Sequence, residues 1–300
     1  MASEHDKRYK KLFAYPGFME RLLNSFVNED FVKELDFSTL KRIDKSFISE
    51  SYKEKESDII YTVEYKDHTI YIFLLLEFQS TVDKKMAVRF ARYITELYDS
   101  YQGKTKSGKL PGVFPILLYN GDDKWTAPVE FSDCVENTLP KEYIPQFRYF
   151  PVLENEIPKT SLLKIKNALS AVFYIENSSV TEIAEELDNF FELIKKEDLE
   201  IVNLLSSWFN NYLKSLYKKR PGSKEISDTE LTRKFDSILE VKNMFATKTR
   251  EHDKIVLEQG IEQGIEETAL RMLEKEFSIE DIAEITNLSP EDIIKLNSKK

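Results

Sequence analysis

The spacing of apolar residues in the first 80 positions changes from helical to strand-like. Residues 5–28 carry apolar side chains at helical spacing, and Pro16-Gly17 divides them into two short predicted helices. Alternation over residues 58–65 predicts a strand, and a short hairpin connection leads from it into a second, largely apolar strand over residues 70–79. An earlier strand is predicted over residues 47–52. This part of the chain is therefore predicted to be two helices followed by a meander of three strands.

The next segment returns to helical spacing before one more apolar run. Residues 84–101 place apolar side chains every three or four positions, which predicts a helix directly after the third strand. Residues 113–119 form a further apolar run that is closed by Asn120-Gly121, which predicts a buried strand. The order of helix, three-stranded meander, helix and strand indicates an α/β core.

Beyond residue 120 the chain is first irregular and then helical. Five prolines interrupt residues 125–158, and this segment is predicted to wrap irregularly around the sheet. Helical patterns over residues 161–175, 181–194 and 199–217 predict amphipathic helices. We therefore divide residues 1–217 into a core over residues 1–160 and a helical extension over residues 161–217 that packs on the core.

The last third of the chain begins with a basic cluster that contains helix breakers. This cluster predicts a linker over residues 218–229, followed by an all-helical tail over residues 230–300. The tail repeats Glu-Gln-Gly-Ile twice from Glu258, and glycines four apart permit either close helix–helix contact or a flexible tether. Ser278 and Ser289 are predicted N-caps of a small helix-turn-helix, whose acidic second helix favours packing against protein over reading of DNA bases.

Two acids and an amide fall at the ends of neighbouring predicted strands. Glu77 and Gln79 follow the apolar run of the third strand, and alternation places them on one face about 7 Å apart. The neighbouring strand can bring Asp58 alongside them. Such a group suits Mg²⁺ or Mn²⁺, which lowers the pKa of a bound water and neutralises charge on a phosphodiester during hydrolysis.

These residues also carry a family resemblance. The chain resembles the recombination-promoting nuclease group, the PD-(D/E)XK nuclease family transposases, at Asp58, Glu77, Gln79, Ser80, Met86, Arg89 and Tyr93. Further residues of this chain resemble the elements that flank the site in the same family: His5-Asp6-Lys7, Lys10, Lys11-Leu12-Phe13 and residues 116–121. The resemblance covers roughly the first 120 to 150 residues well and the tail more loosely.

The resemblance implies a restriction-endonuclease-like core that cleaves DNA with the help of a metal ion held by Asp58 and Glu77. Gln79 stands where the superfamily has Lys, so it would orient the attacking water or the phosphate by hydrogen bonds instead of by charge. A nearby cation could substitute for that Lys, and the candidates are Lys10, Lys11 and Arg89, which are also the basic residues that we expect to contact DNA. Arg89 and Tyr93 lie one helical turn apart and could either face the DNA backbone or form a structural pair.

Charge and cysteine content restrict the remaining classes of protein. One cysteine and three histidines argue against an intramolecular disulfide, a cysteine-based zinc site and a histidine-rich metal site. The net charge of −10 is uneven: residues 1–120 carry 19 Lys and Arg against 18 Asp and Glu, which leaves 24 against 35 for the other 180 residues. A nearly neutral core with a few placed cations can bind DNA in a salt-dependent way.

The start of the chain lacks an apolar signal region and the longest apolar run is short, so we expect a cytoplasmic protein without a membrane segment.

Three functions follow from these patterns. The first is a Mg²⁺-dependent DNA endonuclease of the recombination-promoting type, with DNA as its partner. The second is a catalytically weakened protein of the same fold that serves as a DNA-binding or protein-interaction module. The third is a helical oligomerisation adaptor in which Asp58 and Glu77 form only a structural polar cluster, although an acid at the end of a buried strand weighs against it. We also expect a homodimer through the C-terminal helices, since two active sites are needed to cut both strands of a duplex at once.

Overall fold

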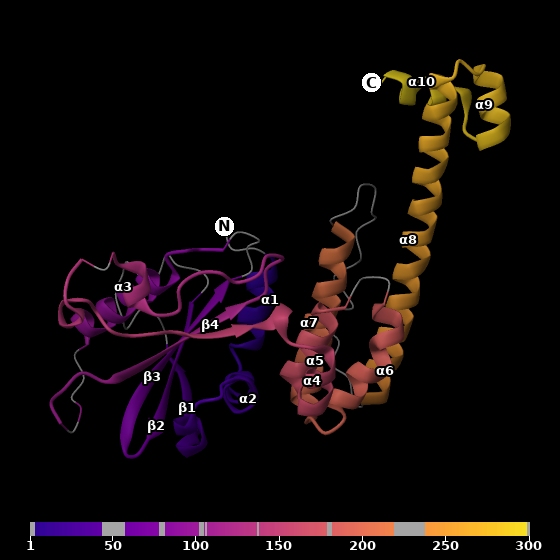
Figure 1. Ribbon diagram of the computed structural model, residues 1–300. Helices are drawn as coiled ribbons and strands as arrows, with labels where there is room; N and C mark the ends of the chain where they lie inside the picture. The colour runs from indigo at the N-terminus through magenta and orange to yellow at the C-terminus, as the bar shows by residue number, and fades with distance from the viewer. Residues whose placement is uncertain are drawn as a thin grey trace.

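The computed structural model describes residues 4–43, 58–77, 82–101, 105, 107–136, 138–178, 182–218 and 238–298. Figure 1 shows an α/β part at one end, a group of helices in the middle and a long helix that rises away from the rest at the other end. Short 3-10 helices occur in the α/β part at η1 (Asp30–Glu34), η4 (Phe131–Cys134), η5 (Lys141–Tyr143) and η6 (Glu154–Glu156).

A five-stranded mixed sheet in the order β1-β2-β3-β4-β5 forms the centre of the α/β part. The strands β1 (Leu35–Ile43), β2 (Asp58–Tyr65) and β3 (His68–Glu77) form an antiparallel meander. The strands β4 (Gly112–Tyr119) and β5 (Phe150–Leu153) run parallel to β3. The predicted α/β class and the order of helix, three-stranded meander, helix and strand are confirmed, and β5 is an addition that the sequence pattern did not indicate.

The first strand lies earlier in the chain than predicted. The segment at residues 47–52, for which we predicted a strand, lies outside the described residues. The register of β1 against β2 shifts between Asp36 and Lys41, and the buried residues Leu35 and Leu40 are an odd number of positions apart. Such an irregularity interrupts the two-residue alternation, which is why the apolar pattern did not reveal β1.

Helices cover both faces of the sheet. The helices α1 (Glu4–Leu12) and α2 (Pro16–Phe26) pack with one face, which includes Leu74 of β3. The helix α3 (Met86–Ser100), together with the segment that follows β4, packs with the other face, which includes Leu75. Neighbouring residues of β3 therefore enter two separate cores, as expected for a strand that is buried on both faces.

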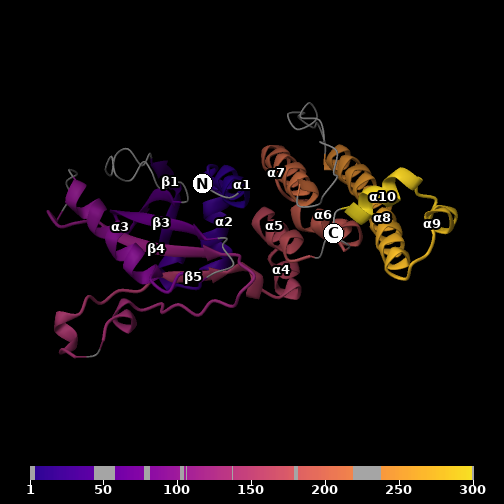
Figure 2. The same cartoon turned by 90° about the horizontal axis from the view of Figure 1, so that it is seen from above.

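The predicted helical extension consists of α4 (Lys159–Ile165), α5 (Ala168–Glu176), α6 (Ile183–Ile194) and α7 (Leu199–Lys218). The helix predicted over residues 161–175 is two helices, because Lys166 ends α4 in the left-handed conformation and Asn167 begins α5 with a capping box to Ser170. The extension contacts the α/β part through α1 with α7 and α2 with α5. Figures 1 and 2 both place α1 and α2 between the sheet and the extension.

The C-terminal part consists of α8 (Ile238–Glu274), α9 (Ile279–Thr286) and α10 (Pro290–Ser298). The helix α8 packs against α6 and α7, so the tail is partly docked on the extension. Its far end forms a small separate core with α9 and α10 (Figure 1). The predicted N-caps are confirmed: the hydroxyl groups of Ser278 and Ser289 each accept a hydrogen bond from the backbone N–H three residues ahead. None of the described helices combines the length and apolar composition that a membrane-spanning segment requires.

The turn between β2 and β3 generates a first prediction. Lys66 and Asp67 have φ values of 48° and 61°, and Tyr65 pairs with His68, which is the geometry of a two-residue type I′ hairpin. We expect Asp67→Gly to raise the free energy of unfolding by up to about 1 kcal/mol, because glycine avoids the penalty of a left-handed backbone. Urea unfolding would measure the change. Asp67→Ala is the control and should lower the stability, and an unchanged midpoint in both variants would contradict the argument.

Candidate functional site

Asp58 opens β2 and Glu77 closes β3 at the same end of the sheet. Asp58 pairs with Leu75, and Glu77 lies two residues further along β3. Residues two apart in a strand share a face, so the backbone puts positions 58 and 77 diagonally on one face, at a separation of about 7 to 8 Å in ordinary antiparallel geometry. Ile60 and Phe73 pack against α3 on this same face.

The neighbouring strands end at the same level. Glu77 pairs with Tyr119 of β4, and Tyr119 pairs with Leu153 of β5. The residues that follow these two strands, Asn120 and Glu154, therefore start at the edge of the sheet to which Glu77 belongs. The carboxyl ends of parallel strands are a common place for ligand sites in α/β proteins.

The predicted metal site is described only by its backbone positions. The carboxylates of Asp58 and Glu77 lie outside what the structure describes, as do Gln79 and Ser80 entirely. Among the side chains that are described, no group of three or more His, Cys, Asp or Glu residues is arranged to hold a metal ion. The binding of a cation between Asp58 and Glu77 stays a prediction.

The predicted basic contacts to DNA come from two faces of the sheet. Lys10 and Lys11 belong to α1, which packs on the face opposite to positions 58 and 77. Arg89 belongs to the first turn of α3, on the same face as these positions. Its guanidinium Nη1 lies 3.2 Å from Oδ2 of Asp83, and 27% of its side chain is exposed. Of the three, Arg89 is the cation whose helix covers the face of the predicted site.

Tyr93 is a core residue. Only 2% of Tyr93 is exposed, and it packs in the cluster between α3 and the sheet. The guanidinium of Arg92 lies 5.2 Å from the centre of its ring. A side chain this deeply buried has almost no surface to offer DNA, so the predicted DNA contact of Tyr93 is wrong.

A buried polar network lies behind the same edge of the sheet. The Tyr9 hydroxyl lies 2.8 and 2.7 Å from the two carboxyl oxygens of Glu154 and 2.9 Å from Oε2 of Glu176. Asn120 donates a 3.0 Å hydrogen bond to Glu176, and Arg8 lies 3.9 Å from it. Burial, followed by the charge of Glu176, raises the pKa of Glu154 well above its ordinary value, although the hydrogen bond with Tyr9 opposes this.

Little in the sequence indicated this network. Glu154 follows the proline-interrupted segment and Glu176 ends a predicted amphipathic helix, and acids in such places are usually exposed to solvent. Tyr9 followed the helical spacing of core residues. Asn120 was the one available signal, since it is a polar residue directly after an apolar strand, and it is the residue that connects the sheet edge to Glu176.

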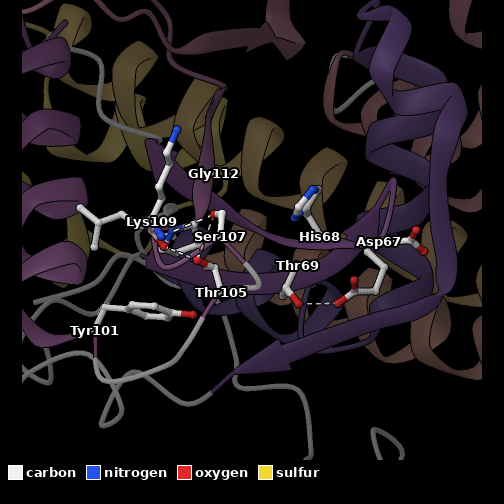
Figure 3. A pocket seen from close by; sticks show the side chains of 11 residues that line it. Asp67, His68, Thr69, Tyr101, Thr105, Ser107, Lys109 and Gly112 are labelled. Carbon is white, nitrogen blue, oxygen red and sulfur yellow. Dashed lines mark hydrogen bonds between the residues drawn. The ribbon is translucent and has the colours of Figure 1, made fainter.

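A surface hollow with a volume of about 550 Å³ lies at the other end of the strands. Figure 3 shows Tyr101 and Lys109 on one side of the hollow and His68 and Thr69 on the other. It is formed by the β2–β3 turn, the segment after α3 and the start of β4. The hollow is therefore separated from positions 58 and 77 by the length of the strands and is no part of the predicted site.

Comparison with known proteins supplies the family context. A sequence model for the family described as "Putative transposase, YhgA-like" matches residues 3–201. The chain is 26% identical over 317 aligned residues to the "Inactive recombination-promoting nuclease-like protein RpnE" of Escherichia coli strain K12, covering 97% of each. It is 28% identical over 133 residues to "Recombination-promoting nuclease RpnD" of Escherichia coli O157:H7, covering 44% of this chain and 50% of RpnD. It is 31% identical over 130 residues to "Recombination-promoting nuclease RpnC" of strain K12, covering 43% of this chain and 42% of RpnC. No solved structure matches the chain.

Proposed function

The chain belongs to the YhgA-like putative transposase family, and we propose that it is a metal-dependent DNA endonuclease of the recombination-promoting type. The observation that supports this most is the register of β2 against β3, in which positions 58 and 77 share one face at one end of the sheet. Two relatives that are named recombination-promoting nucleases support the reaction class. The order of the core elements supports a restriction-endonuclease-like fold.

Asp58 and Glu77 would hold Mg²⁺ or Mn²⁺ in this proposal. The donor set fits, because such a cation keeps several waters and needs only one or two protein carboxylates. When bound, the cation would activate a water and stabilise charge that develops on the phosphodiester. Gln79 would orient the water or a phosphate oxygen by hydrogen bonds, since an amide carries no charge. Both acids act from strand ends, which hold them more rigidly than a loop would.

Arg89 would supply the positive charge that Gln79 lacks. It lies in the first turn of α3, close in sequence to the end of β3, and its partner Asp83 is itself partly exposed. An ion pair with both side chains partly exposed to solvent contributes little net free energy, so a DNA phosphate could replace Asp83 beside Arg89. Lys10 and Lys11, on the other side of the sheet, would contact the DNA backbone away from the cleaved bond.

One observation favours a second function. The relative that covers 97% of the chain is named inactive, and Gln79 stands where the superfamily uses Lys. A catalytically weakened DNA-binding or protein-interaction module is therefore the alternative. The two functions differ in one measurable property, because only the nuclease converts bound DNA to nicked product when a divalent cation is added.

We further propose a homodimer through the C-terminal helices. Leu257 and Ile261 of α8 are 63% and 56% exposed, and nothing lies within 4 Å of a side chain built at Gly260 or Gly264. A helix that contains two interior glycines and exposes its apolar residues is weakly stable alone. A second copy of α8 would cover these residues, and it would bring two active sites to one duplex.

The metal site yields the second prediction. Asp58→Asn and Glu77→Gln should each abolish Mg²⁺-dependent nicking of supercoiled plasmid by the full-length protein and leave the fold intact. Removing either charge relieves like-charge repulsion, so the metal-free variants should be at least as stable as the parent. Asp99→Asn, at an exposed position of α3, is the matched control and should nick like the parent. Parent activity that persists in EDTA would contradict the metal assignment, and gel-shift binding without any nicking would favour the weakened module.

The third prediction concerns Gln79. Gln79→Ala should lower the single-turnover nicking rate by a factor on the order of 10², as removal of one positioned hydrogen-bond donor often does. Gln79→Lys should retain activity, because lysine is the superfamily residue at this place. If Gln79→Ala cuts at the parental rate, the amide has no part in the chemistry and the nuclease proposal must rely on Arg89 alone.

The fourth prediction concerns self-association. Ile261→Lys should convert the dimer to a monomer, because it places a charge in the apolar contact between two copies of α8. Light scattering coupled to size-exclusion chromatography would measure the mass. Glu262→Lys is the control on the neighbouring exposed position and should keep the dimer. A parent that is already monomeric would show that α8 does not mediate dimerisation.

A further inference from the structure

Glu154 is a buried acid that the proposed nuclease site does not use. It begins η6 directly after β5 and is 0% exposed. Its carboxyl group contacts the hydroxyl of Tyr9 on α1, which in turn contacts Glu176 at the end of α5. The three residues thus join the first helix, the sheet edge and the helical extension.

The number of hydrogens in this contact limits the charge state. The hydroxyl of Tyr9 has one hydrogen, yet two separate carboxyl groups lie within 2.9 Å of its oxygen. If both glutamates were ionised, one of them would meet the phenol oxygen with no hydrogen between the two atoms. One of the two carboxyl groups must therefore carry a proton.

The neighbouring groups identify Glu154 as the protonated acid. Glu176 accepts a hydrogen bond from Asn120 and lies 3.9 Å from the guanidinium of Arg8, so a negative charge on Glu176 has an N–H donor and a cation beside it. The described ion pairs include none with Glu154. A second carboxylate in this place would be a buried charge without a counterion, which proteins avoid.

We propose that Glu154 is a neutral carboxylic acid whose proton completes a latch between the α/β core and the helical extension. Glu154 donates its O–H to the oxygen of Tyr9, and Tyr9 donates its own O–H to the Glu176 carboxylate. The latch closes only while Glu154 keeps its proton. This inference is independent of the proposed nuclease function, since it concerns the contact between the α/β core and the extension and involves neither Asp58 nor Glu77.

The charged and polar groups around the latch come from every element that packs on it. The helix α1 supplies Arg8 beside Tyr9, and the Arg8 guanidinium lies 5.5 Å from the centre of the Tyr212 ring on α7. The Tyr212 ring stacks on Trp208 of the same helix. Asn177, after α5, donates a 2.9 Å hydrogen bond to the backbone carbonyl of Glu154. The latch therefore lies where α1, α5 and α7 meet the end of the sheet.

The sign of the pH dependence follows from the raised pKa of Glu154. The unfolded chain releases this proton near the ordinary carboxyl pKa of 4.5, whereas the folded chain keeps it to a higher pH. Between these two pH values the folded state holds one proton more than the unfolded state. The stabilisation that Glu154 contributes is therefore fully present below pH 4.5 and is lost as the pH rises through the folded-state pKa. The docking of the extension therefore weakens toward alkaline pH.

The fifth prediction tests the latch with full-length protein. Glu154→Gln keeps a neutral hydrogen-bond donor of the same shape that does not titrate, so the stability of this variant should not depend on a proton at position 154. From about pH 5 upward, the unfolding equilibrium constant of the parent should rise relative to that of Glu154→Gln by about tenfold per pH unit. Glu156→Gln, an exposed acid in the same η6, is the control and should follow the parent.

A second measurement covers the case in which Glu154→Gln does not fold. Infrared spectra of the folded parent at neutral pH should contain the carbonyl stretch of a protonated carboxylic acid, and Tyr9→Phe should shift this band because it removes the partner of the proton. A constant ratio of equilibrium constants across the pH series, or the absence of the band, would overturn the proposal. Neither readout depends on DNA cleavage, so a failure of the latch is distinguishable from a failure of the nuclease proposal.

Discussion

The pairing of β3 with both of its neighbours is the constraint on which the rest of the structure depends. The strand is hydrogen-bonded to β2 on one side and to β4 on the other, and its side chains enter a core on each face of the sheet. A strand with no free edge and no free face has a single acceptable register, because a slip of one residue would exchange the two faces. The position of Glu77 relative to Asp58, and of α1 relative to α3, follows from that register.

The end of β3 is also where the buried environment stops. Apolar residues fill the strand from Ile72 to Leu76, and the first acid follows directly after them. The backbone of position 77 is held by its pairing with β4, at the last residue of β3. The proposed nuclease function requires such a position, since metal ligands must be preorganised while one position stays open to substrate.

The helical extension is attached by a contact of a different kind. Apolar side chains of α5 and α7 share one core with α1 and α2, and the polar group formed by Tyr9, Glu154 and Glu176 lies within that contact. Apolar packing tolerates small displacements, whereas a hydrogen-bonded network has one geometry in which all members are satisfied. The network therefore defines how α1, and with it Lys10 and Lys11, is oriented between the sheet and the extension.

The sequence by itself determined the features that depend on local spacing. Alternation predicted β2, and an apolar run predicted β3 with the acid that ends it beside Asp58. Helical periodicity predicted α3, α6 and α7, and two N-cap serines predicted the pair α9 and α10. Local patterns fail where a distant partner decides the outcome. The shifted register hid β1, and the short strand β5 is a strand only because β4 lies beside it.

The tertiary structure alone decided which polar residues are buried and with which partners. Tyr93 was predicted at a DNA surface and lies in a core, because the segment after β4 folds over α3. Tyr9, Glu154 and Glu176 lie far apart in the chain, and none has a local sequence context that marks a buried polar group. Their contact arises only when α1, η6 and α5 meet at one end of the sheet, and the resulting loss of solvent, which no sequence pattern records, is the largest cause that raises the pKa values of Tyr9 and Glu154.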